Sequence, residues 1–384
     1  MFAKQLSVLA LAGQALAQTP SLLQALNSSS SLSSLSGVLA LNPQLVETLG
    51  NAQNITILAP SNAAFAKIDN ATLTALTANT GLLTAILQYH VLNGTVYGSQ
   101  VTNTSAFVPT LLTNPLFTNV TGGQRVRAQL SRGNVTFFSG LNYNSTVSQA
   151  NVNFTGGVIH VIDSLLTLPE NISSTATAAG LTSLRGALNA TNLVNTVDTA
   201  QNITIFAPNN AAFQAISSGL SNLTTEQITS VLTYHAVVGA QPIYSSAIRN
   251  GTVVPTLNGA NLTVTVNNGS VFVNNAKVVL ADVLVANGVV HVIDAVLNPS
   301  NTTIAGSSAT AGVVAFSGAS SGSAAPFTSG QPSATRSIAP AASTSGGAGG
   351  AGGSSSSRAG AAQAVQTGSV GMGAILGAAA VFFL

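Results

Sequence analysis

The residues of this chain that could do acid–base chemistry are four histidines, which occur as two equivalent pairs. His90 and His235 each follow a tyrosine, whereas His160 and His291 each begin the sequence HVID. A histidine can activate a serine nucleophile when an acidic side chain orients it. In HVID the histidine and the aspartate are three residues apart, so on a strand they point to opposite faces. The spacing therefore predicts no His–Asp relay, and a secreted hydrolase is the least favoured function.

The elements that carry these histidines are a helix and a strand in each copy. Apolar residues recur at helical spacing over 83–90 and again over 228–235, and a histidine ends each stripe. We expect a buried, hydrogen-bonded histidine there more than a ligand or catalyst, because buried polar groups need partners. Tyr89 and Tyr234 point about 100° away, and we expect their phenols to be available for an interface. The HVID segments alternate apolar residues on both faces, which is typical of a central strand.

These elements belong to a long internal repeat. Residues 52–68 and 200–216 are identical at thirteen of seventeen positions. Three blocks recur in the same order at offsets of 148, 145 and 131 residues, so the first copy is longer, mainly between its two histidines. Each unit is large enough for its own core. The repeat predicts two homologous domains, at 19–169 and 175–299.

Local patterns predict how each copy begins and ends. The β-branched residues at 56–58 and 204–206 predict a strand that stops at Ala-Pro, because proline cannot donate to a ladder. Asn62 and Asn210 are expected to cap the helix that follows. Residues 261–273 alternate apolar and polar positions around Asn-Asn-Gly, which indicates a hairpin.

The sequences at the two ends of the chain predict targeting and attachment signals. Residues 1–17 combine a lysine, an apolar run and an Ala-x-Ala site, which is typical of a cleaved secretory signal peptide. Residues 370–384 are apolar and shorter than the roughly 20 residues of a membrane span. With the small residues and spacer before them they match a lipid-anchor signal, with Ser355 as the expected acceptor. Residues 300–369 are rich in Ser, Gly and Ala and predict a disordered stalk and spacer.

Composition excludes several classes of function. The chain has no cysteine, which excludes thiolate nucleophiles and disulfides, and only 5% of its residues are charged. Processing at both ends would leave eight basic and eight acidic side chains, so we expect no nucleic-acid binding. We also expect no metal site, no cofactor and no catalytic residue.

Glycan attachment and glycan contact are both suggested by the sequence. Seventeen Asn-x-Ser/Thr sequons occur, and each is an acceptor only where it is exposed. The selected glycosylation candidates are Asn54, Asn93, Asn144, Asn202 and Asn261. Arg125 and Arg127 lie on one face of an expected strand, where a polyanionic glycan could bind. The alternative, favoured by base rates for such charges, is a solvated face.

The three repeated blocks resemble the fasciclin domain family. TILAPSNAAFAKI at 56–68 and GGVIHVID at 156–163 are similar to its two signature segments, and each has a counterpart in the second copy. The resemblance implies an α+β fold with two tandem domains, each a twisted β wedge of about seven strands with a packed helical layer. It also implies extracellular adhesion or matrix association, and the composition suits a fungal wall protein.

In animal members of that family, the Tyr-His motif and an Asp-Ile pair have been implicated in integrin binding. The resemblance therefore makes two residue pairs a candidate adhesion motif: Tyr89, His90, Tyr234 and His235. Asp163 and Asp294 are followed by serine and alanine, so the Asp-Ile pair is absent.

The leading hypothesis from the sequence is a glycosylated cell-surface protein, lipid-anchored in the outer leaflet of the plasma membrane or held in the cell wall. It would mediate cell–cell or cell–matrix adhesion, with surface or matrix proteins or polysaccharides as partners and weak self-association. The alternative is a glycan-binding protein that organises the cell wall or extracellular matrix.

Overall fold

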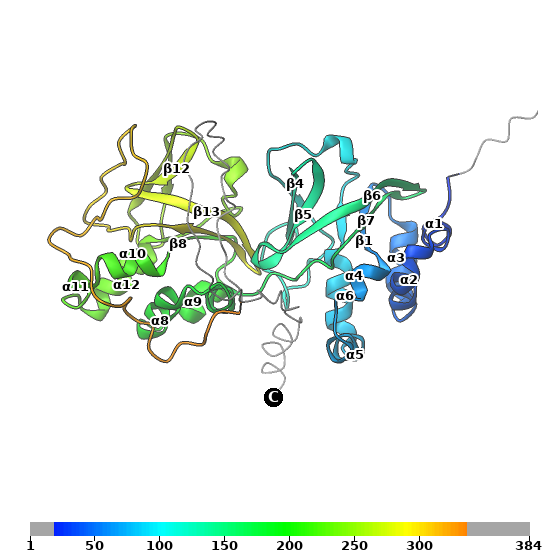
Figure 1. Ribbon diagram of the computed structural model, residues 1–384, viewed down its shortest axis with the longest axis horizontal. Helices are drawn as coiled ribbons and strands as arrows, with labels where there is room; N and C mark the ends of the chain where they lie inside the picture. The colour runs from blue at the N-terminus through cyan, green and yellow to red at the C-terminus, as the bar shows by residue number, and fades with distance from the viewer. Residues whose placement is uncertain (1–18, 336–384) are drawn as a thin grey trace, which may run out of the picture.

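The computed structural model describes residues 19–335, which form two domains arranged along the long axis of the molecule (Figure 1). Each domain has one seven-stranded sheet with helices packed against it. The expected α+β fold with two tandem domains is therefore confirmed.

Domain 1 contains six α-helices and three short 3-10 helices within the described residues. The helices are α1 (Leu22–Asn27), η1 (Ser30–Leu32), α2 (Ser33–Ala40), α3 (Pro43–Asn51), α4 (Asn62–Phe65), α5 (Asn70–Ala78), α6 (Thr80–Tyr89), η2 (Gly98–Gln100) and η3 (Gly140–Asn142). The strands are β1 (Ile55–Pro60), β2 (Val91–Asn93), β3 (Ala106–Pro109), β4 (Arg125–Ser131), β5 (Asn134–Phe138), β6 (Asn144–Phe154) and β7 (Gly157–Ile162).

The sheet of domain 1 has the order β2-β1-β7-β6-β5-β4-β3. Only β1 and β7 pair in parallel, with Ile57 opposite Ile159, and the other pairs are antiparallel. Every residue of β1 is buried, as expected for a central strand covered on both faces.

Domain 2 repeats this architecture. Its helices are α7 (Ile172–Ala178), α8 (Thr182–Ala190), α9 (Val194–Thr199), α10 (Asn210–Ala215), α11 (Ser217–Leu220), α12 (Thr225–Tyr234) and η4 (Ser245–Ala247). Its strands are β8 (Ile203–Pro208), β9 (Ala236–Val238), β10 (Thr252–Pro255), β11 (Asn261–Asn267), β12 (Ser270–Val273), β13 (Ala276–Val285) and β14 (Gly288–Ile293). The order β10-β11-β12-β13-β14-β8-β9 is that of domain 1 read from the other edge, and the hairpin expected at 261–273 is β11–β12.

The helix after the first strand is capped one residue earlier than the sequence suggested. Ser61 and Asn209 are the N-caps, and their side chains accept from backbone N–H groups of α4 and α10. Asn62 instead accepts from the N–H of Ser34, and Asn210 makes the same bond in domain 2. The expected caps therefore join two helices, because the residue before each already satisfies the helix end.

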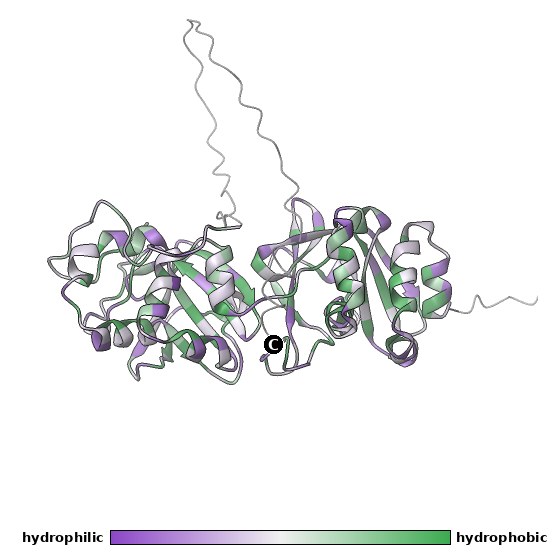
Figure 2. Ribbon diagram, turned by 90° about the horizontal axis from the view of Figure 1, so that it is seen from below, coloured by the Kyte–Doolittle hydropathy of each residue, from purple (hydrophilic) through white to green (hydrophobic). Residues whose placement is uncertain are grey.

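The core of each domain lies on both sides of its sheet. One cluster in each domain packs the sheet against the helices, and a second fills the space enclosed by the twisted outer strands. The helices carry both hydrophobic and hydrophilic residues, as amphipathic helices that cover a sheet must (Figure 2).

Residues 300–335, which we call the strap, contain no helix or long strand but run along domain 2. The N–H of Gly312 donates to Asp294 Oδ2 at 2.8 Å, and the ring of Phe327 meets that of Phe213 edge-on at 6.4 Å. The strap passes so close to α8 that a Cβ on Gly186 would overlap the carbonyl of Phe327. The disordered stalk expected from residue 300 is therefore wrong for this first part, which binds the domain.

The signal peptide at 1–17, Ser355 and the apolar tail at 370–384 lie outside the described residues. Within residues 19–335, no helix combines the length and the apolar character that a membrane crossing needs.

Candidate functional site

The histidines of the Tyr-His motif are structural bridges. His90 Nδ1 lies 2.8 Å from the carbonyl oxygen of Ile86, and the N–H of Leu166 donates to its Nε2 at 2.9 Å. Because Nε2 accepts, the ring is neutral and Nδ1 carries the proton. His235 makes the equivalent two bonds in domain 2. Burial lowers the pKa of each to about 4, although the hydrogen bond to the backbone carbonyl opposes that shift.

The tyrosines beside them are fully buried, which corrects the expectation of phenols available for an interface. Tyr89 Oη donates to the carbonyl of Arg125 at 3.0 Å, and Tyr234 Oη donates to that of Asn261 at 2.8 Å. Burial raises the pKa of both phenols. These tyrosines fasten the outer strands to the helix end and offer no surface for direct contact with a partner.

The histidines of the HVID segments hold a bulge in the neighbouring strand. His160 Nε2 lies 2.8 Å from the carbonyl of Val96, and the N–H of Asn151 donates to Nδ1. His291 repeats this arrangement with the N–H of Asp282. Asp163 instead accepts from the N–H of Thr146 on β6. The expected separation of histidine and aspartate is therefore present.

No histidine of the described chain is placed to act as a general base. All four are at most 4% exposed, and both nitrogens of every ring meet backbone groups. Residues 19–335 also contain no group of three or more acidic or histidine side chains that could hold a metal ion. A hydrolase built on these histidines lacks an accessible base.

The two arginines suggested for glycan contact lie between the domains. Arg127 Nη1 is 3.8 Å from Asp282 Oδ2 of domain 2, and its guanidinium stacks over the ring of Phe138 at 4.0 Å. Arg125 Nη2 donates to the side chain of Gln241 at 3.2 Å. Burial lowers the pKa of Arg127, which the nearby Asp282 carboxylate partly offsets. The arginines therefore do not form a solvent-facing patch, because domain 2 covers them.

Residues 110–124, which we call the docking loop, also meet domain 2. It joins β3 to β4 with fifteen residues, whereas five residues, 256–260, join the equivalent β10 and β11. The buried Gln124 donates to the carbonyl of Val285 at 3.1 Å, and the N–H of Asn119 donates to that of Ala286 at 2.8 Å. Most of the extra length of the first copy therefore lies in a loop that meets domain 2.

The surface of domain 2 that receives this loop and the adjoining residues of β3 and β4 is called the socket here, and it consists of Asn202, Gln241, Tyr244, Asp282, Leu284 and Ala286. Asn202 makes two hydrogen bonds with Thr121, at 2.8 Å each: its Oδ1 accepts from the backbone N–H of Thr121, and its Nδ2 donates to the hydroxyl oxygen. The ring of Tyr244 stacks on Phe107 of domain 1 with centroids 4.3 Å apart. The paired hydrogen bonds and the stacked aromatic pair together indicate a specific contact between the domains.

The structure divides the five glycosylation candidates. Asn54, Asn93, Asn144 and Asn261 are exposed. Asn202 is 4% exposed, and its Nδ2 donates to Thr121 and to the carbonyl of Ala240. A glycan on Asn202 is incompatible with this conformation, so that candidate is wrong for the joined domains.

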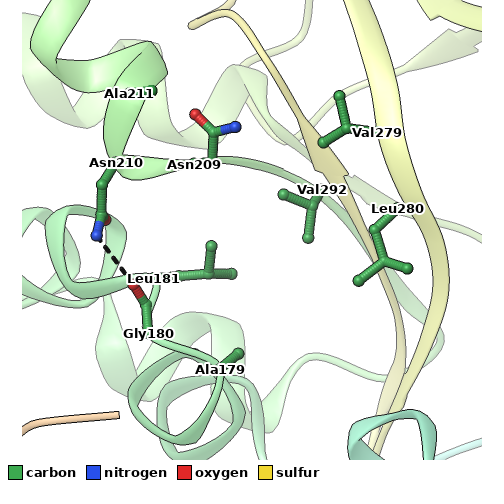
Figure 3. Close-up of a pocket in the computed structure, with 9 residues that line it drawn as sticks. All are labelled: Ala179, Gly180, Leu181, Asn209, Asn210, Ala211, Val279, Leu280 and Val292. Atoms are coloured by element: carbon green, nitrogen blue, oxygen red, sulfur yellow. Dashed lines mark hydrogen bonds between the residues drawn. The ribbon is translucent and has the colours of Figure 1, made fainter. Parts of the chain in front are cut away.

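A cavity of about 460 Å³ in domain 2 was not expected from the sequence (Figure 3). Leu181, Leu280 and Val292 point into it from a loop and two strands. Its two asparagines are used elsewhere, since Asn209 caps α10 and Asn210 holds the carbonyl of Gly180. The lining residues include no charged side chain, so the cavity supplies no catalytic group.

Three residues of the contact between the domains were not predicted from the sequence: Gln124, Tyr244 and Asp282. The only signal was the unequal offset of the repeats, which located the insertion without revealing what it touches.

Comparisons with known proteins agree with this architecture. The fasciclin domain family model matches residues 30–169 and 179–299. A fasciclin-like arabinogalactan protein of Arthroderma benhamiae is 37% identical over 324 residues, covering 82% of this chain and 76% of that protein. Another, from Phaeosphaeria nodorum, is 31% identical over 254 residues, covering 66% and 80%.

A solved fasciclin domain pair from an insect cell adhesion molecule, fasciclin I, is 18% identical with a TM-score of 0.34, covering 68% of this chain and 96% of that one. On the family model and the fungal relatives, the chain belongs to the fasciclin domain family as a tandem pair, and its family implies an adhesion or cell-wall-related function.

Proposed function

We propose that this chain is a glycosylated, lipid-anchored surface protein that mediates cell–cell or cell–matrix adhesion through its joined fasciclin domains. The observation that carries the proposal is the specific interface between the domains, which presents them as one unit. A rigid unit loses less freedom on binding than two independent domains would. The four exposed glycosylation candidates and the relatives' names support a wall or surface setting.

The anchor is supported by the sequence of the last fifteen residues, 370–384, and by the small residues around Ser355. An anchored protein gains from multivalency, because many weak contacts on one surface act at high effective concentration. Adhesion therefore does not need a deep ligand pocket.

The test displays the full chain on cells that do not otherwise adhere. Adhesion to cells and to a purified wall-polysaccharide surface is counted before and after phosphatidylinositol-specific phospholipase C. We expect gained adhesion that falls as protein is released. A chain ending before residue 370 is the matched control, and we expect it in the medium with no gain in adhesion.

Release without any adhesive gain would support the anchor and contradict adhesion. Binding to polysaccharide without binding to cells would favour the alternative role in organising the wall. That role would need contacts other than Arg125 and Arg127, because domain 2 covers both.

A further inference from the structure

The contact between the domains is head-to-tail, and contacts of this kind can lead to uncontrolled self-association. The docking loop of domain 1 meets the socket of domain 2, so the two surfaces are different. Head-to-tail contacts that do not close a ring can propagate from copy to copy into open assemblies. Because the domains are repeats, domain 1 has its own counterpart of the socket.

That counterpart is a near copy of the socket. Asn54 has the left-handed backbone of Asn202, with φ of 57° and 53°. Tyr97 stands where domain 2 has Tyr244, directly before the equivalent 3-10 helix. Asn151, with φ of 61°, occupies the bulge position that Asp282 holds with φ of 64°.

The counterpart is open to solvent in this chain. Tyr97 is 42% exposed, whereas Tyr244 is 7% exposed against Phe107. Asn54 and Asn151 are exposed as well. A second copy whose docking loop came free would find here an asparagine and a tyrosine placed as in the socket.

Two sequons lie on this open face. Asn54 begins Asn-Ile-Thr, and Asn153 begins Asn-Phe-Thr at the position of the buried Leu284. β7 lies between them, so they are two strands apart at one end of the sheet, roughly 10 Å. Both are exposed, and in the described part of the chain neither Nδ2 has a hydrogen-bond partner. A glycan attaches to that nitrogen, which is free here and engaged in Asn202.

We infer that Asn54 and Asn153 carry N-linked glycans that cover this face and prevent the docking loop of a second copy from binding there, while Asn202 stays unmodified. An N-glycan is bulky and hydrated, so it excludes a protein surface from the patch around it. The inference rests on the secretory route of the proposed function. It goes beyond that function because it assigns a role to two sequons: their glycans keep the protein monomeric.

The first experiment measures glycan occupancy in the full chain secreted from cells, by mass spectrometry of glycopeptides. We expect glycans on Asn54 and Asn153 and none on Asn202. The peptides around Asn54 and Asn202 are distinguishable, because Leu58 in one is Phe206 in the other. Asn70, exposed at the start of α5, is the reference sequon.

The outcomes separate the two proposals. If no sequon is occupied, Asn70 included, the secretory route itself fails. If Asn70 is occupied while Asn54 and Asn153 are bare, the route stands and the glycan cover is overturned. A glycan on Asn202 in protein whose domains remain joined would also overturn it.

The second experiment tests what the glycans exclude. Asp282→Asn weakens the contact between the domains and so raises the fraction of chains in which the docking loop has separated from the socket. Sedimentation equilibrium then reports self-association. We expect this variant to stay monomeric with its glycans. Adding Asn54→Gln and Asn153→Gln should at least double its apparent mass as concentration rises, whereas adding Asn70→Gln should not.

A monomeric Asp282→Asn, Asn54→Gln, Asn153→Gln variant would overturn the inference, provided that circular dichroism shows it folded. Further substitution of Phe107 by alanine in that variant tests whether the open face binds the docking loop region of a second copy. It should reverse the association, because Phe107 on β3, beside the docking loop, is the ring of domain 1 that stacks on the tyrosine of the socket.

Discussion

The sequence AQNITI occurs once in each domain, but its asparagine is exposed in domain 1 and buried in domain 2. Asn54 and Asn202 share sequence, strand position and left-handed backbone. Asn54 is exposed and accepts from the N–H of Thr95, whereas Asn202 is buried against Thr121. The difference comes from the docking loop, which only the first domain has at this length. A repeat therefore predicts the local fold, while an insertion elsewhere decides which copy of a surface is used.

The largest effect we expect is one that the two domains share. His90 and His235 are neutral and buried, each with a pKa of about 4 against an ordinary 6.5. The unfolded chain therefore binds protons more tightly between these values, so stability is complete above pH 6.5 and falls as pH drops towards 4. At about 1.4 kcal/mol per pH unit, each histidine accounts for about 3 kcal/mol.

Urea unfolding at pH 7 and pH 4.5, followed separately for each domain by hydrogen exchange, checks this expectation. Both domains should lose stability, and His90→Gln should remove part of the pH slope from domain 1 alone. Equal stability of wild-type protein at the two pH values would contradict the structural role of these histidines.

The next effect should differ between the equivalent positions Asp282 and Asn151. Asp282→Asn removes the carboxylate facing Arg127, which is only 13% exposed, and leaves that guanidinium without its counter-charge. We expect a loss of about 2 kcal/mol of interdomain binding, at the lower end for buried charge pairs. Asn151→Asp is the matched control, because no cation of residues 19–335 forms an ion pair at that position, and it should change stability by less than about 0.5 kcal/mol. Small-angle scattering and hydrogen exchange at β8 would report domain separation, and equal effects of both variants would contradict the role of the ion pair.

A smaller effect should separate the two equivalent tyrosines. Tyr244→Leu removes the ring stacked on Phe107, and we expect the domain contact to weaken by about 1 kcal/mol. Tyr97→Leu removes an exposed ring and should leave the contact unchanged. The rate of proteolysis between the domains is a suitable measurement. A larger increase from Tyr97→Leu than from Tyr244→Leu would contradict the assignment of the contact to Tyr244.

The strap offers a comparison that concerns domain 2 alone. Phe327→Ala removes the half-buried ring that meets Phe213, and we expect domain 2 to lose about 1 kcal/mol, less than for a fully buried phenylalanine. Domain 1 should be unaffected. Calorimetry with two resolved transitions would show this, and an unchanged second transition would mean that the strap adds no stability.

Much of the scaffold followed from local pattern. Helical spacing placed His90 at the end of a buried stripe, and alternation predicted the β11–β12 hairpin. Patterns failed where a neighbour competed for the same role. Asn62 resembles a cap, but Ser61 takes that bond and Asn62 holds another helix instead.

The sequence by itself determined that the chain is a tandem repeat of one fold, because periodicity and capping are written in residues close together along the chain. It also located the insertion in the first copy. Only the tertiary structure decided that Arg127 meets Asp282 and that Asn202 is buried while Asn54 is not. Those outcomes depend on contacts between residues 81 to 161 positions apart. The energies of these contacts come from burial and pairing across the domains and leave no periodic pattern in either segment.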